Sequence, residues 1–153
     1  MTSVQLREEI DIEIDYLCTL VEEINSLRKD VEGREPTIRE KTAAAAFLAQ
    51  FYGGIENILK RIHRYYGLTL PIGDTWHLDL FKRFCLPGHE LLPLLFDQKL
   101  ARELAPFRKF RHVVHHGYGF QVEWERIIDG LESVDGVLGA VKLALKLFVD
   151  DLQ

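Results

Sequence analysis

The segment RHVVHHGYGF, residues 111–120, holds the side chains of this sequence that are best suited to chemistry. One arginine, three histidines and one tyrosine fall within eight positions: Arg111, His112, His115, His116 and Tyr118. Histidine takes or gives a proton near neutral pH, because its reference pKa is about 6.5. Arginine supplies a planar cation that stays charged beside a phosphate. This combination suits cleavage of RNA, whose own 2′-OH group serves as the nucleophile.

In this interpretation His116 is the general acid and base, and Arg111 stabilises negative charge on the phosphate oxygens. Tyr118 would stack on a base or bond a phosphate. A regular helix turns 100° per residue, so Arg111 and His116 would lie about 140° apart around it. Either the helix opens at the glycines that follow, or a second protomer completes the site. We favour the second arrangement, a homodimer.

The sequence gives weaker indications of a role for the other titratable side chains. His112 and His116 are four residues apart and share a helix face, as a metal pair would, but no third ligand is close in sequence. We therefore predict no metal and no other cofactor. Glu56, in an apolar stretch, either pairs with Arg111 across the bundle or is an exposed glutamate. The remaining histidines are expected to be structural or solvated: His63, His77 and His89.

Composition excludes several classes of protein. The 153 residues fit one domain, residues 1–153, and 47% hydrophobic with 28% charged residues is typical of a globular protein. No apolar run approaches the roughly 20 residues that cross a bilayer, and the acidic N-terminus lacks a secretory signal. Cys18 and Cys85 form no CxxC motif, which favours reduced, partly buried thiols in the cytoplasm. No GxGxxG, Walker or HExxH motif is present.

Charge is unevenly distributed along the chain. The net charge is −5, yet residues 98–118 hold five basic residues against one acidic residue, whereas residues 1–35 hold four against ten. The basic segment includes Arg108 and Lys109, which we expect to support substrate binding together with His112 and His115. Such a patch concentrates a polyanion even on an acidic protein. The alternative is a cationic helix face that pairs with the acidic first helix.

Apolar residues recur every three or four positions through most of the chain, which predicts helices. We expect helices over residues 3–31, from Pro36 to about Tyr66, and from about Glu123 to Val149. A short helix follows Asp74 or Thr75, carries Phe84 and Cys85, and ends at Pro87-Gly88. Another begins after Asp97, is broken or kinked at Pro106, and frays at Gly117 and Gly119. The sequence predicts an all-α antiparallel bundle of four long helices plus a short helix.

The pair Gly53-Gly54 lies inside the second of these helices, where each glycine costs about 1 kcal/mol relative to alanine. Such a pair usually indicates the close approach of another backbone, within the bundle or across a dimer.

The motif R-x4-H-x-Y, formed by Arg111, His116 and Tyr118 near the end of the penultimate helix, resembles the HEPN superfamily and above all its HepT-like ribonuclease toxins. The surrounding FRKFRHVVHHGYGFQVEWERI (107–127) and FYGGIENILKRI (51–62) strengthen the resemblance. It covers nearly the whole chain in helix order, although only residues 107–120 are specific.

The resemblance implies a small helical bundle that dimerises and cleaves RNA, with tRNA as one candidate, without a metal. It implies that Arg111 and His116 are catalytic and that Tyr118 contacts RNA. A cognate MNT-type nucleotidyltransferase antitoxin would neutralise the toxin by transferring AMP to Tyr118. His112 stands where the superfamily commonly has a polar residue, which implies an orienting or phosphate-contacting role. Relatives often have arginine at the position of His115. Which RNA phosphates this position contacts is therefore left open.

The sequence also allows a second function, of a different class from the ribonuclease. The chain would then be a non-catalytic interaction module that dimerises and binds a partner protein or RNA through the basic face of residues 98–118. The acidic overall charge and the angle between Arg111 and His116 favour this module. The joint presence of Arg111, His116 and Tyr118 favours the enzyme.

Overall fold

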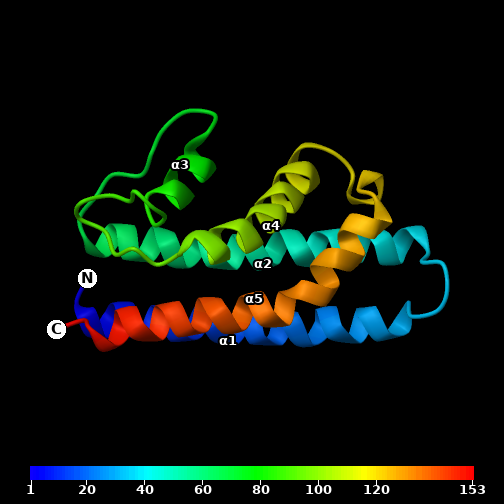
Figure 1. Ribbon diagram of the computed structural model, residues 1–153, viewed down its shortest axis with the longest axis horizontal. Coiled ribbons are helices and arrows are strands. Elements are labelled where there is room, and N and C mark those ends of the chain that lie inside the picture. Colours follow the sequence, from blue (N-terminus) through cyan, green and yellow to red (C-terminus); the bar gives the residue numbers. More distant parts are fainter.

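The computed structural model describes all 153 residues and is built from helices alone (Figure 1). Its elements are α1 (Ser3–Asp30), α2 (Ile38–Tyr65), α3 (Trp76–Lys82), α4 (Gln98–His116), the short 3-10 helix η1 (Gly119–Gln121) and α5 (Trp124–Asp150). The chain runs up and down through the long helices, so that both termini lie at one end of the molecule (Figure 1). The prediction of four long helices plus a short one is confirmed.

Side-chain caps determine where three of the long helices begin. The Thr2 hydroxyl accepts the N–H of Gln5, at 3.1 Å, and Thr37 accepts the N–H of Glu40, at 3.2 Å, each in a reciprocal capping box. The Asp97 carboxylate accepts the N–H of Leu100, at 2.8 Å, which confirms the predicted cap of α4. Pro36, expected inside the first turn of α2, instead precedes its cap.

Helix α4 continues through Pro106, so of the two predicted outcomes, a break and a kink, the break does not occur. The missing N–H of proline removes one hydrogen bond, and the helix bends at that cost. Figure 1 shows the result: α4 first follows α2 and then turns away from it toward its histidine-rich end.

The short helix α3 ends at Lys82, before the predicted end at Pro87-Gly88. Phe84 and Cys85 therefore lie outside it, in a turn whose Phe84 carbonyl accepts the N–H groups of Leu95 and Phe96, both at 3.1 Å. This turn ties the chain after α3 to the segment that precedes α4.

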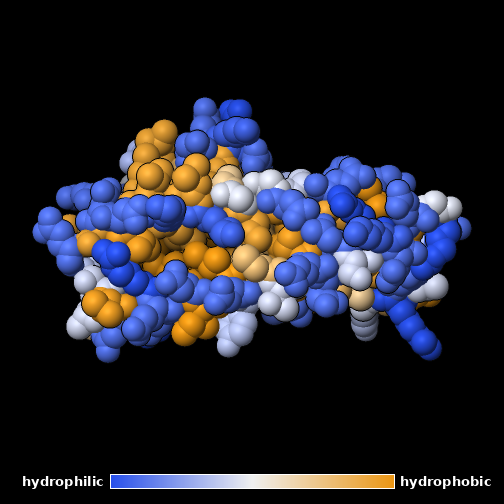
Figure 2. Space-filling view, turned by 90° about the horizontal axis from the view of Figure 1, so that it is seen from below, coloured by the Kyte–Doolittle hydropathy of each residue, from blue (hydrophilic) through white to orange (hydrophobic).

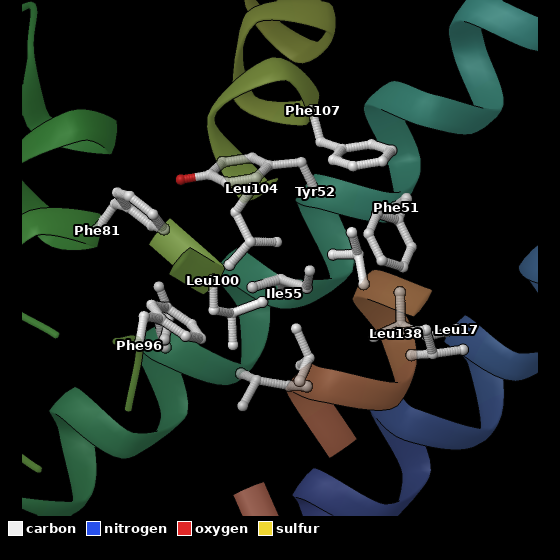
Figure 3. Close-up of a cluster of buried hydrophobic side chains, with 14 of the residues drawn as sticks. Leu17, Phe51, Tyr52, Ile55, Phe81, Phe96, Leu100, Leu104, Phe107 and Leu138 are labelled. Atoms are coloured by element: carbon white, nitrogen blue, oxygen red, sulfur yellow. The ribbon is translucent and has the colours of Figure 1, made fainter. Parts of the chain in front are cut away.

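One cluster of 33 buried residues forms the core, and its centre is aromatic (Figure 3). The ring of Phe51 from α2 meets that of Phe107 from α4 edge-on, with centroids 5.0 Å apart. Tyr52 lies near Phe81 of α3, and Phe81 stacks on Phe96 with centroids 5.5 Å apart. These contacts hold α3 and α4 against the same face of α2.

Helices α1 and α2 pack closely along their length. A Cβ added at Gly54 would lie 2.6 Å from Cδ2 of the buried Leu17, whereas one added at Gly53 would meet nothing within 4 Å. The expectation of a second backbone within the bundle is thus corrected, because Gly54 accommodates a leucine side chain of α1. Close approach across a dimer stays a prediction. Arg61 of α2 adds ion pairs with Glu9 and Glu13, at 3.1 and 3.2 Å.

An apolar depression lies on the surface among many charged side chains. Exposed leucines Leu94, Leu143 and Leu147 line a depression between the segment before α4 and the end of α5. Figure 2 shows apolar side chains breaking the polar surface on the face seen from below. None of the helices is both long enough and apolar enough to cross a membrane.

Candidate functional site

Arg111 lies on the face of α4 that turns toward α2, with its side chain about 20% exposed. Its Nη2 is 3.7 Å from Oε1 of Glu56, a residue that is only about 2% exposed. Glu56 is therefore the buried partner that one of the two sequence interpretations expected, and the exposed alternative is wrong. A buried carboxylate requires neighbouring cations and hydrogen bonds, because burial alone disfavours its charge.

His77 of α3 completes the surroundings of Glu56. Its Nδ1 donates to Oε2 of Glu56 at 2.7 Å, and its Nε2 lies 3.4 Å from Nη1 of Arg111. Since the carboxylate accepts at Nδ1, a neutral His77 leaves Nε2 free to accept from the guanidinium. The imidazole thus links Arg111 to Glu56 by a second route. His77, expected to be structural or solvated, belongs to the surroundings of Arg111.

Lys60 supplies a second cation, with its Nζ 3.8 Å from Oε1 of Glu56. The same ammonium lies over the ring of Trp76, 4.9 Å from the ring centroid, and Trp76 contacts the His77 ring at a centroid distance of 3.5 Å. Glu56 of α2 and His77 of α3 therefore hold the guanidinium of Arg111, while Lys60 shares the same carboxylate.

A groove of about 530 Å³ runs beside this network, between α1, α2 and α4. Arg111 and His115, one turn apart on α4, line it together with Glu56 and Lys60. Reduced hydration lowers the pKa of His115, and the positive charges of Arg111 and His116 lower it further. His115 therefore tends to be neutral beside the guanidinium.

His116 lies on a different side of α4. Its ring is 4.5 Å from that of His112, centroid to centroid, and both residues are exposed. No hydrogen bond or ion pair joins His116 to Arg111, and His116 does not line the groove that Arg111 lines. Helix α4 stays regular through His116 and ends at Gly117, so its opening at the glycines does not bring His116 to the groove that Arg111 lines.

Arg108 and Lys109, which precede Arg111 on α4, also lie in different surroundings. Arg108 is half-buried, and its Nε is buried without a hydrogen-bond partner. Lys109 is exposed and lines a separate depression between α4 and α5, together with Arg126 and Asp129. None of the cations of residues 98–118 forms an ion pair with α1, so the alternative of a cationic face paired with the first helix is wrong.

Tyr118 follows the end of α4 and is 66% exposed. Its backbone N–H donates to Oε1 of Gln121 at 3.1 Å, which fixes the turn into η1. Its ring stacks on that of Phe120, with centroids 5.5 Å apart and planes at 19°. Its hydroxyl makes no hydrogen bond within the chain and faces the surface.

His112 and His116 lack further ligands for a metal, because no group of three or more His, Cys, Asp or Glu side chains is close enough to hold an ion. Both cysteines are free, and burial raises the pKa of the Cys85 thiol to about 11. The thiols are therefore structural features of the bundle.

Residues 43–152 match the model of the family described as HepT-like protein. No curated protein and no solved structure matches the chain. The matched region runs from the second turn of α2 to the end of α5 and includes Glu56, His77, Arg111, His116 and Tyr118. By this match the chain belongs to the HepT-like family.

Proposed function

We propose that this protein is an endoribonuclease toxin that cleaves RNA in the cytoplasm, with Arg111 and His116 as catalytic residues and without a metal. The anchoring of Arg111 by the buried Glu56 and by His77 is the observation that carries the proposal. A guanidinium held at one end of a groove is preorganised for phosphate charge, and preorganised charges are the most effective in catalysis.

The reaction follows from these two side chains. His116 removes the proton from a ribose 2′-OH, and the oxygen attacks the adjacent phosphorus. Arg111 stabilises the negative charge that builds on the phosphate oxygens. The bond from phosphorus to the 5′-oxygen breaks, a protonated imidazole returns a proton to that oxygen, and a 2′,3′-cyclic phosphate is left.

The separation of Arg111 and His116 on α4 supports a homodimer in which one chain supplies the arginine and the other the histidine. In the same proposal an MNT-type nucleotidyltransferase is the antitoxin, and it transfers AMP to Tyr118. The 66% exposure of Tyr118 supports that role, because a modifying enzyme needs access to the phenol.

A non-catalytic interaction module is the second candidate. The separation of Arg111 from His116 within one chain favours it, because a single chain then lacks a complete catalytic pair.

Incubation with total RNA and with tRNA in EDTA tests the proposal. Wild type should leave fragments with cyclic or 3′-phosphate ends, while Arg111→Ala and His116→Ala should leave the RNA intact. Arg126→Ala, at an exposed arginine of α5, serves as the matched control and should cleave like wild type. Equal cleavage by all variants would exclude this site. If none cleaves, an AMP on the Tyr118 peptide indicates a silenced toxin, and an unmodified peptide favours the interaction module.

A mixture of the two inactive variants tests the shared site. Refolded together in equal amounts, Arg111→Ala and His116→Ala chains form mixed dimers with one complete site in two. About a quarter of wild-type activity should then return, since half of the dimers are mixed. No recovery in a mixture shown to contain mixed dimers would place both residues in the same protomer's site.

A further inference from the structure

The end of α4 carries an exposed pair of aromatic rings that the proposed reaction does not use. Tyr118 is 66% and Phe120 48% exposed, and Phe120 is the one exposed phenylalanine among nine. Exposing such a ring forgoes the free energy of its burial, which the other phenylalanines gain fully or in part. The exposed pair is therefore available to a ligand that presents a flat ring.

The geometry of the pair is that of a stack. The ring centroids are 5.5 Å apart and the planes differ by 19°, so each ring covers part of one face of the other. An offset parallel pair leaves outer faces open to a third flat ring. Bases in a duplex already stack on both sides, whereas an unpaired base offers a free face.

The backbone beneath the pair is firmly held. Tyr118 N–H donates to Oε1 of Gln121, and the N–H of Gln121 donates back to the Tyr118 carbonyl at 3.0 Å. Gly119 passes so close to α2 that an added Cβ would lie 3.2 Å from Cβ of Ala45. Two aromatic side chains on a braced turn lose little freedom when a base binds, which favours affinity.

The location of the pair suits a nucleic acid. Tyr118 is two residues beyond His116, at the end of the segment that has five basic residues and one acidic residue. These cations attract phosphates without regard to sequence, and aromatic rings add contacts to bases. We propose that Tyr118 and Phe120 form a stacking platform for an unpaired base, which directs the protein to single-stranded RNA segments. This inference rests on the proposed ribonuclease function and adds its substrate class.

Binding to RNA that is not cut tests the platform. The His116→Ala protein serves as the background, with a fluorescent single-stranded RNA of roughly 12 nucleotides as one probe and the same sequence in a duplex as the other. Phe120→Leu should weaken binding of the single strand about tenfold and change duplex binding little. Phe120→Trp and Tyr118→Phe keep a ring and should retain affinity. Ile72→Ala, at an apolar side chain exposed to 91% in the loop before α3, is the matched control.

The results of these measurements decide the role of Tyr118 and Phe120. Unchanged single-strand affinity in a folded Phe120→Leu protein overturns the platform, and wild-type cleavage in the same experiment leaves the ribonuclease standing. Lost affinity, with no cleavage by a wild type whose Tyr118 carries no AMP, supports the platform and overturns the enzyme. Conversion of a dimer to a monomer by Phe120→Leu, with RNA affinity unchanged, makes the pair a contact between copies and overturns the platform.

Discussion

Oε2 of Glu56 on α2 lies 2.7 Å from Nδ1 of His77 on α3, although 21 residues separate them in the sequence. The contact joins the central helix to the short helix at the point where Arg111 arrives from α4. One buried carboxylate thereby fixes the positions of three elements and of the cation proposed to bind phosphate.

Replacing Glu56 by glutamine should destabilise the protein by about 2 kcal/mol, because Arg111 and Lys60 would keep their charges beside a neutral amide. Cleavage of RNA should fall at least about tenfold, since Arg111 would lose its anchor. Urea denaturation measures the first effect. Glu123→Gln, which removes a 70% exposed carboxylate, is the control and should stay within about 0.5 kcal/mol of wild type. Equal stability of the two variants would contradict a central role for Glu56.

The two adjacent glycines of α2 should respond oppositely to alanine. Gly54→Ala places a methyl group against the buried Leu17 and should destabilise the protein by about 1–3 kcal/mol. Gly53→Ala meets open space and should stabilise it by up to about 1 kcal/mol through helix propensity. Thermal denaturation of the two variants compares them directly. Equal shifts in the same direction would show that α1 does not pack on Gly54 in solution.

His63 should make the protein less stable as the pH falls below about 6.5. The side chain is fully buried, and its Nε2 accepts from Nη1 of Arg83 at 2.7 Å. Burial lowers the pKa of His63, and the charge of Arg83 lowers it further. Between the lowered folded pKa and the ordinary unfolded one, the unfolded chain binds a proton that the folded chain excludes, so stability decreases with falling pH.

Glutamine at position 63 keeps an acceptor for Arg83 and cannot titrate. His63→Gln should therefore flatten the decrease in unfolding free energy between pH 7 and 5.5, measured by urea denaturation. His112→Gln changes an exposed histidine and should leave the decrease in place. A decrease of the same size in both variants would assign it to other groups.

The helices could be predicted because their apolar periodicity is a local property of the sequence. Helix α4 begins after Asp97 as expected, since a cap depends on residues a few positions away. The end of α3 was placed too late because the carbonyl of Phe84 accepts from Leu95 and Phe96, a contact across a loop. At Pro106, packing of Phe107 and Phe110 in the core outweighs the local cost of the proline.

In the candidate site, too, local features could be predicted from the sequence and contacts between distant segments could not. The motif of Arg111, His116 and Tyr118 is visible in the sequence, and the 140° angle between the first two follows from helix geometry. Glu56 gave a signal, because a carboxylate in an apolar stretch needs a partner. His77 gave none, since its role arises only when the short helix folds back onto α2.

Helix α1 precedes the matched residues 43–152, yet it forms one wall of the groove beside Arg111 with Glu13, Tyr16, Leu17 and Leu20. The opposite walls, which carry Arg111 and its partner Glu56, come from α2 and α4. A change in the exposed residues of α1 would alter what enters the groove and leave Arg111 and its contacts with Glu56 and His77 untouched. Selectivity and chemistry can thus vary separately in this molecule, on helices that belong to different parts of the chain.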